Sequence, residues 1–210
     1  MNNIKKASKW LLAASVGTAL FCAGSASAGQ QAIMETTGLT SQPIGHYEYC
    51  QINRADCRIR ASSKKPMALT RDRWSEMVEV NAYANATVTP VTDMEYFGVP
   101  EIWSMPEAYG DCEDYALLKR RMLMEKGWAA SMLLVTVVRQ PNGDGHAVLT
   151  VRTDRGDFIL DNLNERILPW NKTQYRYLKR QAAAHSGKWE GIADRRNGKA
   201  LVSAVGSVNQ

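Results

Sequence analysis

The sequence predicts an α+β fold in which a central helix packs on an antiparallel sheet. Residues 112–126 carry apolar side chains at helical spacing, and Gly127, directly after them, is a typical helix end. The stretch that follows is rich in valine and leucine and is divided by clusters of glycine, proline and aspartate, which are turn residues. Short turns between consecutive strands predict an antiparallel meander, with strands at residues 131–139, 146–153 and 158–161.

Two further elements are expected, one on each side of this unit. Residues 69–86 have helical spacing, and Thr70 is suited to be the N-cap. Residues 170–183 contain aromatic and aliphatic side chains that predict a strand followed by a helix.

The chain of 210 residues is long enough for one domain with a proper core. It starts with the three parts of an export signal: a basic region, an apolar stretch and the small-residue sequence Ala26-Ser27-Ala28. We therefore expect a signal peptide at residues 1–28, which is removed, and a periplasmic or secreted protein. The mature chain is expected to divide into a mobile N-terminal segment, the folded domain and a C-terminal tail, at residues 29–45, 46–190 and 191–210.

The charge of the mature chain excludes two kinds of partner. The full chain has a formal net charge of +5, and Lys5, Lys6 and Lys9 of the signal peptide contribute +3 of it, which leaves about +2. The remaining basic residues are scattered along the sequence. Neither nucleic acid nor a membrane surface is therefore an expected partner.

Three cysteines remain once the signal peptide is removed: Cys50, Cys57 and Cys112. An oxidising compartment permits disulfides, and Cys50 and Cys57 are close enough in the sequence to pair. Cys112 is then the unpaired thiol, either a nucleophile or a buried inert side chain. The sequence has no Cys-x-x-Cys and no paired-histidine spacing, so a zinc site is not expected.

Cys112 lies where the central helix begins, directly after Asp111, a natural N-cap. The positive end of the helix dipole favours the thiolate, which is the nucleophilic form. His146 begins the second strand, and Asp161 closes the third. A cysteine, a histidine and an aspartate in these places predict a nucleophile, a base and a carboxylate that orients the base, which is the set that acyl transfer requires.

The turn between the second and third strands decides whether His146 and Asp161 meet. A wide turn at residues 152–155 places them directly opposite each other. A two-residue turn at Arg155-Gly156 separates them by four positions, about 13 Å at the usual strand rise. The triad hypothesis therefore predicts the wide turn.

An acyl-transfer site also needs donors for the developing oxyanion. The backbone N–H of Cys112 is one candidate, because the first amides of a helix have no partner within the helix. The indole N–H of Trp103 is a second candidate, against the alternative that Trp103 is a core aromatic residue.

Acidic residues crowd the same helix start. Asp111, Glu113 and Asp114 flank Cys112, and their charges would raise the pKa of the thiol. Either they bind a cation such as calcium, which takes oxygen ligands, or they cap the helix and complement its dipole. The residue types alone favour capping.

Several sequence blocks resemble the bacterial transglutaminase-like cysteine peptidases. They cover roughly residues 47–181, which is nearly the whole mature domain. The most specific block is Gly110-Asp111-Cys112-Glu113-Asp114-Tyr115-Ala116. The others are Tyr49-Cys50 with Asp56-Cys57, Trp103, Pro106-Glu107, His146-Ala147-Val148-Leu149 and Leu160-Asp161-Asn162.

The resemblance implies a papain-like, transglutaminase-like α+β fold with a triad of Cys112, His146 and Asp161. It also implies calcium bound through Asp111 and Glu113, and no organic cofactor is expected. Adhesin-releasing members of the family cut large cell-surface adhesins, which affects biofilms, and are held by an inner-membrane receptor. A protein substrate is therefore expected, with an adhesin and a regulatory receptor as the partners that the family suggests.

The leading hypothesis is an exported cysteine endopeptidase that works through a thioacyl-enzyme. One alternative keeps the triad but transfers the acyl group to an amine, as a transglutaminase does, because both reactions share that intermediate. Another is a non-catalytic periplasmic binding module on the same fold. The sequence leaves these alternatives and the oligomeric state open.

Overall fold

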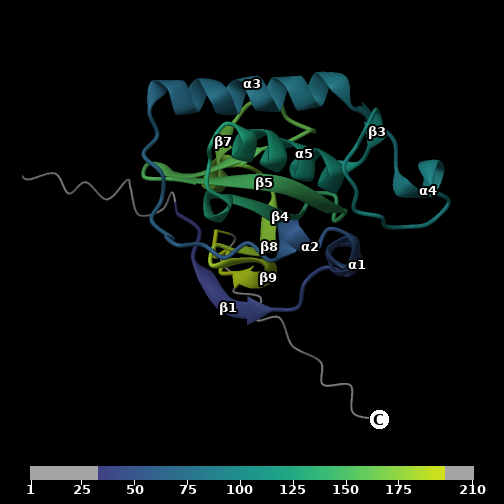
Figure 1. Cartoon of the computed structure of the whole chain (residues 1–210), viewed down its shortest axis with the longest axis horizontal. Helices are drawn as coiled ribbons and strands as arrows, with labels where there is room; N and C mark the ends of the chain where they lie inside the picture. Colours follow the sequence, from purple (N-terminus) through teal and green to yellow (C-terminus); the bar gives the residue numbers. More distant parts are fainter. Residues whose placement is uncertain (1–32, 197–210) are drawn as a thin grey trace, which may run out of the picture.

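The computed structural model describes residues 33–196 (Figure 1). Its helices are α1 Ile44–Ile52, α2 Arg54–Cys57, α3 Arg71–Thr87, α4 Asp93–Tyr96 and α5 Cys112–Glu125, with short 3-10 helices at Ala130–Met132 and Trp170–Lys172. Its strands are β1 Thr36–Thr40, β2 Thr89–Pro90, β3 Tyr109–Gly110, β4 Leu133–Arg139, β5 Gly145–Thr153, β6 Gly156–Leu160, β7 Leu168–Pro169, β8 Arg176–Ala182 and β9 His185–Ile192. Seven strands form one antiparallel sheet in the order β1-β9-β8-β4-β5-β6-β7, while β2 and β3 form a separate parallel pair.

Helices α5 and α3 lie in two layers over one face of the sheet (Figure 1). α5 packs on β5 and β4, and α3 packs on α5. Alternate residues of β4 enter two different apolar clusters: Leu133 and Val135 join the cluster that includes α5 residues, and Val138 joins a second cluster with Val148 of β5. Because both faces of these strands are buried, their sequences are almost continuously apolar rather than alternating.

The helices predicted at residues 69–86 and 112–126 and the predicted meander are confirmed. α5 begins at Cys112, and Gly127 beyond its end has a φ of 85°, a conformation that glycine adopts without a side-chain clash. Thr70 caps α3, since its side chain accepts a hydrogen bond from the Arg73 amide. Strands β4, β5 and β6 are consecutive antiparallel neighbours, as the turn signals predict.

The turn between β5 and β6 is tighter than the triad hypothesis required, so the wide-turn prediction was wrong. Thr153 pairs with Gly156, which leaves only two residues in the turn. Gly156 has a φ of 121°, which favours glycine and allows the tight connection. In this register His146 and Asp161 are diagonal neighbours, two positions away from direct opposition, and long side chains still bridge that spacing.

Two other expectations also differ from the structure. The segment 29–45, expected to be mobile, contains β1, which is an edge strand of the sheet and forms backbone hydrogen bonds with β9. Residues 176–182 form a strand rather than the expected helix, because they pair with β4 on one side and β9 on the other.

The expected C-terminal tail, 191–210, begins inside the sheet. β9 continues to Ile192, and Arg196 makes several hydrogen bonds to the domain. The predicted signal peptide at 1–28 lies outside the described residues. Within residues 33–196, no helix has both the length and the apolar character needed to cross a membrane.

Candidate active site

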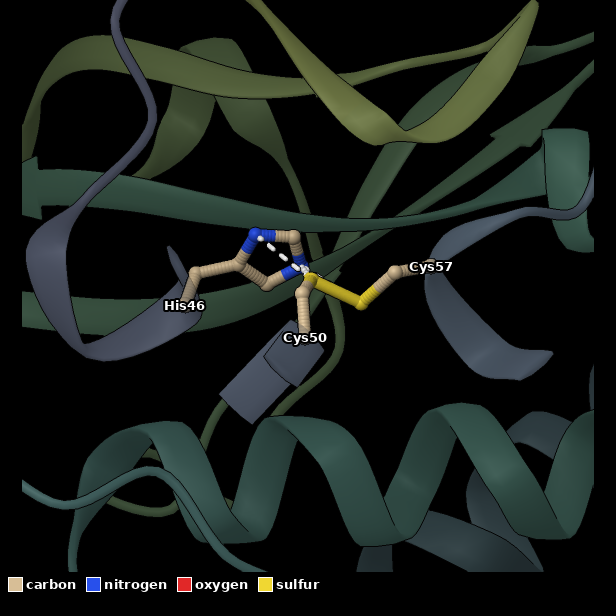
Figure 2. A group of neighbouring side chains, drawn as sticks. All are labelled: His46, Cys50 and Cys57. Carbon is tan, nitrogen blue, oxygen red and sulfur yellow. Dashed lines mark hydrogen bonds between the residues drawn. A yellow bond between two sulfur atoms is a disulfide. The ribbon is translucent and has the colours of Figure 1, made fainter. Parts of the chain in front are cut away.

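The cysteines divide as the sequence predicts. Cys50 and Cys57 form a disulfide between α1 and α2, and Cys112 is the free thiol of the described residues. Figure 2 shows the imidazole of His46 beside this disulfide. The Cys50 sulfur is 3.6 Å from His46 Nδ1 and 3.7 Å from Nε2.

Cys112 is the first residue of α5, and its side chain reaches the start of β5. Its sulfur accepts a hydrogen bond from the backbone N–H of Ala147 (3.3 Å) and donates to Glu113 Oε2 (3.2 Å). Packing of α5 on β5 therefore brings the thiol to the residue that follows His146. The imidazole of His146 is not among the hydrogen-bond partners of this sulfur within the described residues.

His146 and Asp161 form a buried pair, with 2.8 Å between Nε2 and Oδ1 and exposed fractions of 5% and 3%. The same Oδ1 accepts the Leu163 amide (3.0 Å), and Oδ2 accepts the hydroxyl of Tyr175 (2.5 Å). Burial would raise the pKa of Asp161, but the hydrogen bonds and the charge of His146 outweigh it, so the pKa is lowered. The His146 Nε2 is thus committed to a carboxylate, and its Nδ1 has no hydrogen-bond partner among the described residues.

The acids beside the thiol oppose its ionisation. Burial and then the charge of Glu113 raise the pKa of Cys112 well above its ordinary value. Glu113 is itself buried, and burial together with Asp111 raises its pKa to about 9. Burial likewise raises the pKa of Asp114 to about 7. The expectation that the helix start favours the thiolate is therefore not met by the residues alone.

Three carboxylates gather beside the start of α5: Asp93, Asp111 and Asp114, each offering an oxygen within 4.8 Å of the others. Asp93 reaches this place because β2 and β3 pair in parallel, which puts the start of α4 beside the start of α5. Gly110 allows the close approach, since a Cβ there would lie 2.8 Å from Asp114 Oδ2.

This carboxylate cluster is incompletely satisfied by the protein. The side chain of Asp111 makes no capping hydrogen bond to α5, so the interpretation of Asp111 as a side-chain cap was wrong. Asp111 Oδ1 and Asp114 Oδ2 are buried without a hydrogen-bond partner. Unpaired carboxylate oxygens at this spacing fit a hard cation such as Ca²⁺, which takes oxygen ligands.

The expected calcium ligands, Asp111 and Glu113, stay a prediction, and the geometry offers Asp93 and Asp114 as further candidates. Glu113 also lies within 4.8 Å of Asp111, but its Oε2 accepts the Cys112 thiol, whereas the group of Asp93, Asp111 and Asp114 contains the two buried, unpaired oxygens. The residues that best fit the cation are therefore Asp93, Asp111 and Asp114. Sequence reasoning missed Asp93 because nothing local to residue 93 reveals the pairing of β2 with β3.

Trp103 does not supply an oxyanion donor in this structure. Its indole N–H donates to Glu101 Oε1 (2.8 Å), and its ring packs edge-on against His46 and Trp189 in the core. The core-aromatic alternative therefore describes Trp103. The backbone N–H of Cys112 remains the candidate donor, as the first amide of α5.

Tyr175 is a further site residue, and sequence reasoning missed it. Its hydroxyl bonds Asp161, and its ring centroid is 5.4 Å from that of His146. A cavity of about 490 Å³ lies against Asp161 and Tyr175, and Arg166 and Lys172 also line it. The only sequence signal was a tyrosine close to the start of a strand.

The Cys112 thiol at the start of α5 bonds the amide that follows His146, and His146 pairs with Asp161; a thiol, an imidazole and a carboxylate are the groups that thiol-dependent peptidases use. Residues 36–197 match the model of the bacterial transglutaminase-like cysteine proteinases, abbreviated BTLCP, and the chain belongs to this family. It is therefore a cysteine peptidase by family.

Solved structures of LapG from Legionella pneumophila are similar to this chain. The calcium-bound form has 22% sequence identity and a TM-score of 0.46, covering 51% of this chain and 64% of that chain. A second LapG structure has 23% identity and a TM-score of 0.45, covering 51% and 62%, and an EGTA-treated form has 20% identity, a TM-score of 0.40 and the same coverage. The match thus spans less than two thirds of each LapG chain. A search of curated proteins gives no match.

Proposed function

We propose that the protein is an exported cysteine endopeptidase with a papain-like arrangement of Cys112, His146 and Asp161. The observation that carries the proposal is the buried contact of 2.8 Å between His146 Nε2 and Asp161 Oδ1, one residue from the amide that binds the Cys112 sulfur. This contact fixes the imidazole through Nε2 and leaves Nδ1 as the nitrogen that accepts the thiol proton.

In the proposed reaction, the Cys112 S–H turns from Glu113 to His146 Nδ1 and transfers its proton there. The thiolate attacks the carbonyl carbon of the substrate peptide bond, and the backbone N–H of Cys112 donates to the oxyanion. His146 then protonates the leaving amine, which leaves an acyl group on the sulfur as a thioester. Water, deprotonated by His146, hydrolyses the thioester and regenerates the thiol.

Asp93, Asp111 and Asp114 would hold a calcium ion beside the start of α5. When bound, the ion supplies positive charge that offsets the carboxylates around the thiol. The two buried, unpaired carboxylate oxygens support this assignment. LapG of Legionella pneumophila, which has been solved with calcium bound, is consistent with it.

A peptidase acts on a protein substrate, and we propose that this substrate lies in the cell envelope. The proposal rests on the export signal that the first 28 residues predict. A cell-surface adhesin as the substrate and an inner-membrane regulatory receptor are expectations from the family resemblance. We propose no organic cofactor.

The deciding experiment compares cell-envelope proteomes from cells that carry the wild-type chain or Cys112→Ala. New protein N-termini that appear only with the wild-type chain support hydrolysis. Isopeptide cross-links that depend on Cys112 instead favour acyl transfer to an amine. Identical proteomes, together with a purified wild-type thiol that iodoacetamide labels no faster than in His146→Ala, refute the enzyme assignment and favour a binding module.

A further inference from the structure

The carboxylate of Asp161 is held from three directions. His146 Nε2 and the Leu163 amide both bond Oδ1, at 2.8 and 3.0 Å. The Tyr175 hydroxyl donates to Oδ2 at 2.5 Å. Among the described residues, no other side chain forms a hydrogen bond with this oxygen. The Tyr175 ring also lies against the imidazole of His146, at 5.4 Å between centroids and 54° between planes. One side chain therefore touches both members of the pair.

We infer that Tyr175 is a positioning residue for the His146–Asp161 pair, and that Arg196 fixes the chain segment that carries Tyr175. The inference rests on the proposed function, because it assigns a role toward the pair that the proposed reaction uses. Without the Tyr175 hydroxyl, Oδ2 has no partner, and the carboxylate is free to rotate away from the orientation that directs His146 Nδ1.

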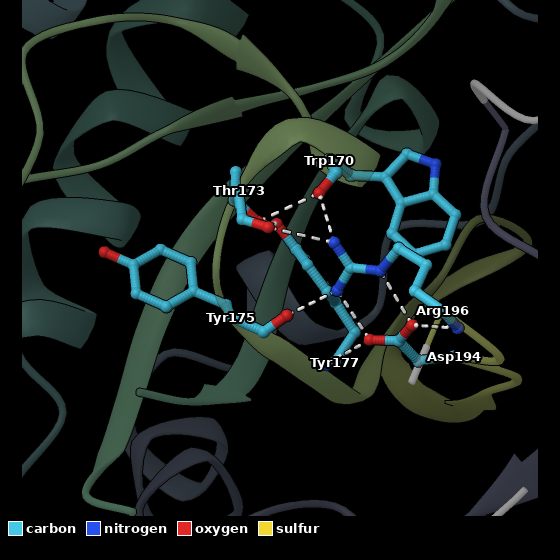
Figure 3. A network of polar contacts seen from close by, with 6 residues as sticks. All are labelled: Trp170, Thr173, Tyr175, Tyr177, Asp194 and Arg196. Atoms are coloured by element: carbon cyan, nitrogen blue, oxygen red, sulfur yellow. Dashed lines mark hydrogen bonds and ion pairs between the residues drawn. The ribbon is translucent and has the colours of Figure 1, made fainter. Parts of the chain in front are cut away.

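Arg196 holds the segment between the second 3-10 helix and β8. Its guanidinium donates to the backbone carbonyl of Trp170, the first residue of that 3-10 helix, and to those of Thr173 and Tyr175 in the segment; the first two distances are 3.1 Å. Figure 3 shows the Tyr175 carbonyl facing the guanidinium while its phenol extends away from it. The backbone of Tyr175 is therefore fixed on the side opposite to its hydroxyl.

The guanidinium is itself held in place. Asp194 pairs with it at 2.6 Å, and the side chain of Asp194 is only 5% exposed. The guanidinium carbon lies 4.7 Å from the ring centroid of Trp170 and 5.1 Å from that of Tyr177. A planar group with five donors is suited to bond several carbonyls at once while it stacks on aromatic rings. Lysine offers a point charge and cannot reproduce this set of contacts.

Tyr177 provides an internal comparison. It lies two residues after Tyr175 and is buried, and the Arg196 guanidinium stacks on its ring. Its hydroxyl, however, bonds the Thr173 side chain at 2.9 Å rather than Asp161. Loss of this second hydroxyl therefore perturbs the same segment without releasing Asp161.

The titratable groups that act on Asp161 come from three elements. His146 from β5 and Tyr175 beside β8 bond it directly. Lys119 from α5 is buried and interacts with it through its charge, and Tyr177 of β8 adds a weaker interaction. Of these groups, the Tyr175 hydroxyl is removed by Tyr175→Phe while the ring against His146 is kept.

The first measurement is the titration of the Asp161 carboxyl carbon by NMR in the mature protein with saturating calcium, assigned with Asp161→Asn. In Tyr175→Phe we expect the midpoint to rise by about one pH unit, because the carboxylate loses a hydrogen bond that favours its charged form. In Tyr177→Phe we expect the wild-type midpoint. Equal midpoints in the two variants would overturn the inference, and this outcome does not depend on any enzymatic activity.

The second measurement is the rate at which iodoacetamide alkylates Cys112 at neutral pH, read by intact mass. We expect Tyr175→Phe to slow alkylation about tenfold, which is the scale of one hydrogen bond to a charged group, and Tyr177→Phe to leave it unchanged. A wild-type rate no faster than that of His146→Ala would refute the proposed function, whereas the Asp161 titration would still test the positioning role.

Arg196→Lys tests the support of the segment. We expect a smaller rise of the Asp161 midpoint than in Tyr175→Phe, and no additional rise when both changes are combined, because Arg196 acts through Tyr175. Circular dichroism and the thermal midpoint establish that each variant is folded. If the rise of the Asp161 midpoint in the double variant equals the sum of the rises in the two single variants, the link between Arg196 and Tyr175 is contradicted.

Discussion

The stability of the domain is predicted to fall as the pH drops below 6.5, because His46 is buried in its neutral form. Its side chain packs edge-on against the rings of Trp103 and Trp189, which also contact each other, and is 1% exposed. Burial, and then the positive charge of Arg120, lower its pKa from 6.5 to about 4. The Trp189 indole donates to Nδ1 at 3.1 Å, so this nitrogen must stay unprotonated in the native state.

The sign and the size follow from proton linkage. Above pH 6.5 His46 is neutral in the folded and unfolded states, and its full contribution to stability is present. As the pH falls from 6.5 toward 4, the unfolded chain binds a proton that the native state does not bind, and stability is lost. The difference of about 2.5 between the pKa of His46 in the unfolded and folded states corresponds to a loss of about 3 kcal/mol in unfolding free energy. This loss is complete only below the folded-state pKa.

Urea unfolding of the disulfide-intact protein at about pH 7.5 and about pH 4.5 measures this loss. We expect His46→Gln to reduce the decrease in unfolding free energy between these conditions by about 2.5 kcal/mol, since glutamine keeps an acceptor for Trp189 but does not titrate. His185→Gln is the matched control, because His185 is less buried than His46. This variant should keep most of the wild-type decrease in unfolding free energy between the two pH values. If His46→Gln shows the same decrease as the wild type, the assignment of a buried neutral imidazole is refuted.

Three further predictions concern the thiol, the carboxylates and the disulfide. Cys112→Ser should abolish peptidase activity and iodoacetamide labelling while the thermal midpoint stays within a few degrees of wild type; full activity would remove the nucleophile. EGTA should lower the thermal midpoint of the wild type, and Asp93→Asn or Asp114→Asn should make the midpoint insensitive to EGTA; a wild-type midpoint indifferent to EGTA would contradict the calcium site. Replacing Cys50 and Cys57 together by alanine should lower the unfolding free energy by about 2.5 kcal/mol, the chain-entropy value for so short a loop; no change in urea midpoint would show that the disulfide contributes little.

The features predicted well from the sequence are those that neighbouring residues determine. α5 and its end depend on helical spacing and Gly127, and the meander depends on apolar runs between turn residues. The disulfide follows from two cysteines a few residues apart. The choice of Cys112, His146 and Asp161 as a triad used their places at element ends and stays a prediction; the structure pairs His146 with Asp161, and the Cys112 sulfur bonds the Ala147 amide.

The features predicted poorly depend on register and on contacts between distant segments. One pair of turn residues shifts His146 relative to Asp161, and no local signal distinguishes the two-residue turn from the wider one. Asp93 reaches Asp111 only through a two-residue parallel pairing, and Tyr175 reaches Asp161 across the end of the sheet. Their partners lie elsewhere in the chain, so composition and spacing around each residue carry no information about them.

Two opposing effects act on the ionisation of Cys112 at the start of α5. A helix N-terminus stabilises an anion by at most about 2 kcal/mol, or roughly 1.5 pKa units. Burial and the charges of Glu113 and Asp111 act in the opposite direction and raise the pKa of Cys112 well above its ordinary value, so they outweigh the dipole. A cation held by Asp93, Asp111 and Asp114 would offset part of this negative charge and so lower the pKa of the thiol. Asp111 belongs to both sets, because its charge raises the pKa of Cys112 and it is also one of the three carboxylates that would hold the ion.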